Sequence, residues 1–192
     1  MHNKWLISLF LLAVIVALCC PHAVLGETSR YGKPLHRRIT AEVIGLEVKY
    51  VEELKWGNET FALILKDRSA FANATISSFA SRVSRFGVKA VNCSVAFNET
   101  ALTTILECYV SGCVSKTFDR YTADFSWLLW PLGLDFINSG FAEAKDGLSW
   151  SGDLEGVPTE VIVKLPPQEG PYRAWATPYG HCHAHVWWVG KP

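Results

Sequence analysis

The sequence predicts an α+β fold built mainly on antiparallel β-sheet, with one amphipathic helix over about residues 70–86 and a second, short helix near residues 139–145. Apolar and polar residues alternate along several runs, which is the period of a half-buried strand. Between two pairs of these runs, apolar residues recur at helical spacing instead. A chain of 192 residues with 49% hydrophobic content is long and apolar enough for a leader and one domain with a sizeable core.

Residues 1–26 have the three-part layout of a secretory signal peptide. Lys4 supplies a positive charge, residues 5–20 are almost purely apolar, and the small residue Gly26 completes a suitable cleavage site. The apolar run is shorter than the roughly 20 residues that span a bilayer. Cleavage and secretion are therefore expected, and the alternative is a membrane anchor retained through residues 5–20.

Residues 27–39 are polar and basic, and they predict an exposed arm ahead of the domain. Residues 40–192 show neither an internal repeat nor a low-complexity linker, so they predict a single extracytoplasmic α+β domain. Basic and acidic residues balance at 18 each in the whole chain. No nucleic-acid partner is expected, because no basic stripe is present.

The amino-terminal half of the domain predicts the element order β-β-α-β-β. The strands are expected at residues 39–51, 60–65, 88–97 and 101–114, with a turn at 55–59 between the first two. The helix rests on the apolar residues Ile76, Phe79, Ala80, Val83 and Phe86. Ser69 or Asn73 is expected to cap its start, and Gly87 is a natural stop. Asn98-Glu99 is expected to form a two-residue turn between the last two strands.

The carboxyl-terminal half predicts one buried segment and three more strands. Residues 125–137 are the most apolar stretch after the leader and are broken by Pro131 and Gly133, so burial is expected. The alternative is a hydrophobic surface loop that contacts a membrane surface or a partner. A turn is expected where residues 148–152 and 156–158 bracket it, and strands are expected at residues 159–165, 172–176 and 181–189.

Four Asn-x-Ser/Thr tripeptides predict N-glycosylation of an exported chain. They begin at Asn58, Asn73, Asn92 and Asn98. Four is more than this composition would give by chance. These asparagines are therefore expected to lie on the surface, and a protein partner is not expected to cover that side.

Four cysteines remain after the leader, and in an oxidising compartment they predict two disulfides. They are Cys93, Cys108, Cys113 and Cys182. A two-residue turn at Asn98-Glu99 would place Cys93 and Cys108 about 13 Å apart along the sheet, which is too far for a disulfide unless a bulge intervenes. The expected pairs are therefore Cys108–Cys113 and Cys93–Cys182.

The carboxyl-terminal tail holds the one pattern with metal-binding chemistry. His181, His183 and His185 fall on one face of the expected strand, and His-x-His neighbours can converge on Zn²⁺ or another transition metal. The outer two would be about 13 Å apart at their backbones, so two of the three are expected to bind. Other ligands would come from elsewhere in the chain, with His36, Asp153 and Glu155 available.

No enzyme signature accompanies these features: the chain lacks a nucleophile elbow, a Walker loop, a dinucleotide fingerprint and a His-Glu-x-x-His motif. The leading expectation is therefore a non-enzymatic, glycosylated and disulfide-stabilised module that acts by binding or structural assembly. One alternative is a metal-binding protein or metal-dependent enzyme that uses the His-x-His-x-His strand. Another is a lipid or carbohydrate binder that uses Trp127, Trp130, Trp187 or Trp188.

Overall fold

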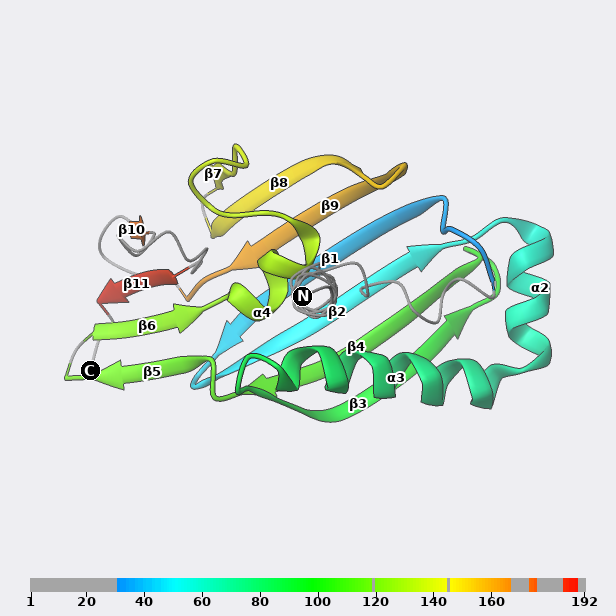
Figure 1. The fold of residues 1–192 in the computed structure, drawn as a ribbon, viewed down its shortest axis with the longest axis horizontal. Helices are drawn as coiled ribbons and strands as arrows, with labels where there is room; N and C mark the ends of the chain where they lie inside the picture. The colour runs from blue at the N-terminus through cyan, green and yellow to red at the C-terminus, as the bar shows by residue number, and fades with distance from the viewer. Residues whose placement is uncertain (1–30, 119, 145, 167–172, 176–184, 190–192) are drawn as a thin grey trace, which may run out of the picture.

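The computed structural model describes residues 31–118, 120–144, 146–166, 173–175 and 185–189, and it confirms the predicted α+β class (Figure 1). The leader and residues 27–30 of the expected arm lie outside this part of the chain. Within the described residues, no helix is both long and apolar enough to cross a bilayer.

A seven-stranded sheet forms the larger layer of the molecule (Figure 1). Its strands are β1 (His36–Ile44), β2 (Glu47–Lys55), β3 (Lys89–Asn98), β4 (Thr103–Ser111), β7 (Ala142–Ala144), β8 (Gly147–Leu154) and β9 (Val157–Lys164). They lie in the order β3-β4-β2-β1-β9-β8-β7. All neighbours are antiparallel except the central pair β1 and β9, which is parallel.

A second, four-stranded antiparallel sheet lies at one end of the molecule (Figure 1). It consists of β5 (Val114–Thr117), β6 (Arg120–Asp124), β10 (Arg173–Trp175) and β11 (His185–Val189), in the order β10-β11-β6-β5. Both sheets contribute to one hydrophobic core, because Ala123 and Val186 pack in the same cluster as Ile39 and Val161.

Helices cover one face of the larger sheet. They are α2 (Asn58–Lys66), α3 (Arg68–Ser84), the short α4 (Ser126–Leu129) and the 3₁₀ helix η2 (Trp130–Leu132). α3 runs along β3 and β4, and α2 lies at the end of the molecule opposite the second sheet (Figure 1). Alternate residues of β1, β2, β4 and β9 are buried beneath the helices. Their neighbours on the other face form exposed ion pairs such as Arg38–Glu160, at 3.1 Å.

Two elements of the amino-terminal half differ from the prediction. The run 39–51 contains the turn of a hairpin, because β1 ends at Ile44 and Gly45 adopts a positive φ of 63°. β1 also begins at His36, inside the expected arm. The strand predicted at residues 60–65 is wrong: these residues belong to α2, in which Phe61 and Ile64 are buried at helical spacing.

The boundaries of α3 agree with the prediction within two residues, but its cap does not. The residue before its first turn is Asp67, and neither Ser69 nor Asn73 caps the helix. The β3–β4 hairpin is confirmed, although its loop is longer than the expected two-residue turn.

In the carboxyl-terminal half, burial of the apolar segment is confirmed. Phe125, Trp127 and Leu129 are almost fully buried, whereas Trp130 in the middle of the segment and Ile137 at its end are about half exposed. The short helix expected near residues 139–145 is wrong, since β7 forms there. The turn bracketed by residues 148–152 and 156–158 is confirmed: β8 ends at Leu154, Glu155 and Gly156 form the turn, and β9 begins at Val157. The strand at residues 159–165 is confirmed as part of β9.

Candidate functional site

All four asparagines of the glycosylation tripeptides are exposed. Asn58 is the first residue of α2, Asn73 lies on α3, and Asn92 and Asn98 lie on β3. These three elements are neighbours at one side of the larger sheet (Figure 1). Glycans at these positions would therefore share one side of the molecule, and β7, β8, β9 and the second sheet carry no such tripeptide within the described residues.

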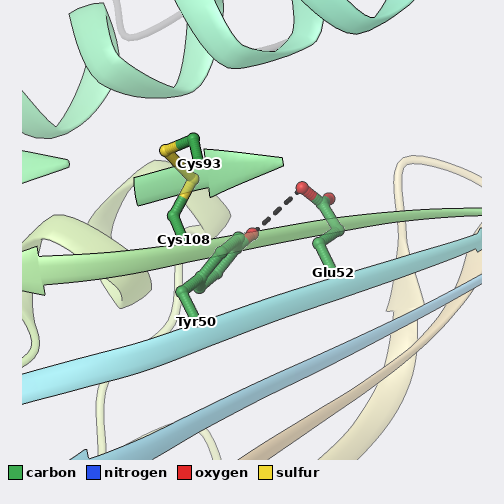
Figure 2. Close-up of a disulfide and its surroundings, with 4 residues drawn as sticks. All are labelled: Tyr50, Glu52, Cys93 and Cys108. Atoms are coloured by element: carbon green, nitrogen blue, oxygen red, sulfur yellow. Dashed lines mark hydrogen bonds between the residues drawn. A yellow bond between two sulfur atoms is a disulfide. The ribbon is translucent and has the colours of Figure 1, made fainter. Parts of the chain in front are cut away.

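A disulfide joins the two strands of the β3–β4 hairpin, and β3 carries two of these asparagines. Cys93 on β3 is bonded to Cys108 on β4, and their Cα atoms are 4.2 Å apart (Figure 2). The expected pairs Cys108–Cys113 and Cys93–Cys182 are therefore wrong. Cys182 itself lies outside the described residues.

The register of the β3–β4 hairpin explains the different pairing. The loop contains four residues, 99–102, because Asn98 pairs with Thr103. The Asn98 side-chain oxygen accepts a hydrogen bond from the Ala101 amide at 3.0 Å, and Leu102 adopts a positive φ of 54°. The longer loop shifts the register and brings Cys93 opposite Cys108.

A buried polar cluster lies beside the disulfide, on the face covered by α3 (Figure 2). Tyr50, which pairs with Cys108 across the strands, donates a hydrogen bond to the Glu52 carboxylate at 3.0 Å. The other oxygen of that carboxylate lies 3.3 Å from Nε of Arg37. The side chains of Arg37 and Glu52 are only 10% and 12% exposed. The Arg37/Glu52/Tyr50 cluster is thus a largely buried ion pair between Arg37 and Glu52, in which the buried Tyr50 hydroxyl donates a hydrogen bond to the Glu52 carboxylate.

This cluster separates two hydrophobic regions of the covered face. Tyr50 belongs to the main core, whereas Leu54 belongs to a smaller cluster with Trp56, Phe61, Ile64 and Phe71 beneath α2 and the start of α3. Glu52 lies between Tyr50 and Leu54 on β2. Sequence analysis did not identify either charged residue. The available signal was that Glu52 shares the alternation of the buried residues Val48, Tyr50 and Leu54.

The phenol of Tyr50 is expected to make folding sensitive to alkaline pH. Burial, and then the nearby Glu52 carboxylate, raise the pKa of Tyr50 well above its ordinary value of 10.0. A raised folded-state pKa stabilises the fold while the phenol is protonated, and that contribution is lost as the pH rises above the ordinary pKa. Chemical denaturation at a series of pH values should show a steeper alkaline fall in unfolding free energy for the wild type than for Tyr50→Phe. Parallel curves would contradict this.

Cys113 lies between β4 and β5 and is a buried, unbonded thiol within the described residues. Its Sγ lies 3.4 Å from the Val110 carbonyl oxygen, to which it donates. Burial raises the pKa of the Cys113 thiol to about 12. Since the thiolate is the nucleophile, little reactive form is present near neutral pH.

Alkylation should therefore distinguish folded from unfolded protein at Cys113. Iodoacetamide near neutral pH is expected to label Cys113 slowly in the folded chain and rapidly in denaturant, as followed by peptide mass spectrometry. Cys93 and Cys108 are the internal controls and should need reductant in both states. Equal labelling before and after denaturation would contradict this prediction. Protection that persists in denaturant would do so as well, because it would mean that Cys113 is oxidised.

The structure describes only the end of the predicted histidine strand. β11 begins at His185, which is partly buried, and Val186 and Trp188 face the core as the alternation predicts. His181 and His183 lie outside the described residues, so their convergence with His185 stays a prediction. Within the described residues, no group of three His, Cys, Asp or Glu side chains could hold a metal ion.

The other ligands considered for a metal lie far from β11. His36 begins β1, Asp153 is near the end of β8, and Glu155 is in the β8–β9 turn. Figure 1 shows this end of the larger sheet well separated from β11. Asp153 also accepts a hydrogen bond from the Gly156 amide at 2.6 Å, which engages it in the turn. These three residues are therefore not ligands for an ion held at His185.

The tryptophans proposed as binding platforms divide into buried and exposed residues. Trp127 and Trp188 are 1% and 2% exposed, so they belong to the core and present no surface. Trp130 is 55% exposed, and its ring makes an edge contact with Phe86. Trp187 is partly buried, with the Arg120 guanidinium 4.7 Å from its ring centre. Of the four, Trp130 offers the most free aromatic surface.

Taken together, the described residues hold a cystine, a largely buried ion pair and a thiol that is protonated near neutral pH. The Glu52 carboxylate already has partners on both oxygens, and the Tyr50 phenol stays protonated. These groups are suited to stabilising the sheet beneath α3. No family model matches the chain, and no curated protein or solved structure is similar enough to it to count as a match.

Proposed function

We propose that the chain is a secreted or surface-exposed module, glycosylated and disulfide-stabilised, that acts by binding or structural assembly. The observation that carries this proposal is that one hairpin, β3–β4, holds both glycosylation tripeptides and a disulfide. Asn92 and Asn98 are exposed on β3, and the cysteine between Asn92 and Ser94 is bonded to Cys108. Disulfides persist in oxidising compartments, and N-glycans are added in the secretory pathway.

The distribution of the sequon asparagines supports binding through the opposite side of the molecule. Glycans are bulky and solvated, so they would exclude a macromolecular partner from α2, α3 and β3. The strands β8 and β9 and the second sheet would stay accessible. A partner of this module is therefore expected to approach the side that carries no sequon.

Expression of the full chain in a glycosylating eukaryotic host tests this proposal. The protein is expected in the medium with Glu27 as its first residue. Its mass should fall on enzymatic deglycosylation, and peptides containing Cys93 and Cys108 should migrate together until reductant is added. A matched variant, Asn73→Gln, should lose the mass of one glycan and still be secreted.

Three outcomes would contradict the proposal. They are retention of the chain in the cytosol, unmodified asparagine at all four tripeptides of the secreted protein, and free thiols at Cys93 and Cys108. Each is read by intact-mass and peptide mass spectrometry on the same sample.

A further inference from the structure

β3 forms one edge of the larger sheet. It pairs with β4 on one side, and no described strand pairs with the other side. A free edge presents unpaired backbone N–H and C=O groups, which can pair with another chain. Of the edges in the two sheets, β3 is the long one: it has 10 residues, whereas β7 and β10 have 3 each and β5 has 4.

Apart from a bulge between Val91 and Ser94, β3 has little of the usual protection against such pairing. Proteins commonly guard an edge with charged side chains, proline or a bulge. In β3 the one charged residue is Lys89, at its start, and proline is absent. Val91, Val95 and Phe97 add the β-branched and aromatic character that favours strands.

A bulge interrupts the edge at one of the sequon asparagines. The register of β3 on β4 shifts between Val91 and Ser94, and Asn92 adopts a positive φ of 51° within it. Asn98 lies at the far end of the strand, where its side-chain oxygen accepts from the Ala101 amide. Both asparagine side chains are exposed. One glycan site thus lies near the middle of the edge and the other at its end.

We infer that N-glycans on Asn92 and Asn98 keep the β3 edge from pairing with the β3 edge of a second copy of this chain. The inference rests on the glycosylation in the proposed function and assigns a role to two of the four sites. A glycan is far larger than the spacing of about 4.8 Å between neighbouring strands, so a glycan at either position prevents a second strand from approaching. Asn58 and Asn73 lie on helices and have no such role.

Variants that remove a sequon but keep its asparagine give the sharpest test. Asn92 has a left-handed backbone conformation that asparagine tolerates better than glutamine does, so replacing it would add strain. Ser94→Ala and Thr100→Ala instead remove the hydroxyl residues of the two tripeptides, and both positions are exposed. The matched control is Asn58→Gln/Asn73→Gln, which removes the same number of glycans from the helices.

Sedimentation velocity and light scattering of the secreted proteins over a range of concentrations supply the measurement. The wild type and the helix control are expected to stay monomeric. Ser94→Ala/Thr100→Ala is expected to self-associate at concentrations at least tenfold lower than any at which the wild type or the helix control does. Adding Ala96→Lys, at an exposed position on the same strand, should restore the monomer, because a lysine on the edge opposes pairing.

The outcomes separate this inference from the proposed function. Peptide mass spectrometry of the wild type establishes first whether Asn92 and Asn98 carry glycans, and unmodified asparagine at both would overturn the inference. If both are occupied and Ser94→Ala/Thr100→Ala is as monomeric as the helix control, the edge role is wrong while the secreted glycoprotein remains. Equal self-association of the two double variants would also overturn it, because general loss of solubility would then explain the result.

Discussion

Replacing Glu52 by glutamine should lower the free energy of unfolding by about 3 kcal/mol, one of the two largest losses expected from a small change in this chain. The substitution keeps the size of the side chain and an acceptor for the Tyr50 hydroxyl. It removes the charge opposite Arg37, whose side chain is 10% exposed. The buried guanidinium of Arg37 has lost its hydrating water, and without Glu52 no negative charge compensates for that loss. The uncompensated desolvation accounts for the lower free energy of unfolding.

Urea denaturation of matched variants measures this effect. Glu160→Gln is the control, because its partner Arg38 is adjacent to Arg37 in sequence but lies on the uncovered face, with side chains 51% and 35% exposed. Such exposed pairs contribute less than about 1 kcal/mol. Arg37→Met/Glu52→Gln should lose less than the sum of the two single variants, since neither partner then remains charged. Equal losses for Glu52→Gln and Glu160→Gln would show that the ion pair is not buried in solution.

Loss of the Cys93–Cys108 disulfide is the second large effect. The two cysteines are 15 residues apart in the chain. Closing a loop of that length restricts the unfolded chain by about 3 kcal/mol. Cys93→Ala/Cys108→Ala should therefore lower the free energy of unfolding by about that amount, and adding reductant to the wild type should have a similar effect.

The control for this prediction is Cys113→Ala, which removes a buried sulfur that closes no loop within the described residues. Cys93 lies inside a glycosylation tripeptide, so all variants are compared after deglycosylation. A smaller loss is expected for Cys113→Ala. If it matched the loss of the double variant, packing of the sulfur atoms would explain both results and the loop-closure account would fail.

The sequence predicted the fold class because alternation and helical spacing are local patterns. It failed where the same pattern suits two structures. Residues 60–65 form a short apolar run, which alternation alone cannot assign, and burial of Phe61 and Ile64 against the sheet selects the helix. The hairpin inside residues 39–51 was missed because the change in the phase of alternation was overlooked: the buried residues lie at odd positions up to Val43 and at even positions from Val48.

The disulfide shows how a small local error propagates. Predicting a two-residue turn at Asn98-Glu99 misplaced the register, because the loop runs to Leu102. In that register Cys93 and Cys108 were too far apart, whereas the observed loop brings them opposite each other with 4.2 Å between Cα atoms. The cluster of Arg37, Glu52 and Tyr50 could be predicted only in part: Glu52 shares the alternation of Tyr50 on β2, but its pairing with Arg37 depends on which strands become neighbours.

The parallel pairing of β1 with β9 has a consequence for the order in which the domain is completed. β1 to β4 and the helices between them are contiguous in the chain, whereas Arg37 of β1 pairs with Thr159 of β9. Contacts so distant in sequence form late, because a long loop must close first. Until β9 is synthesised, the backbone of β1 is an open template beside its buried residues Ile39 and Ala41. In a nascent chain, β1 is therefore a segment that is expected to bind a folding chaperone until β9 is available.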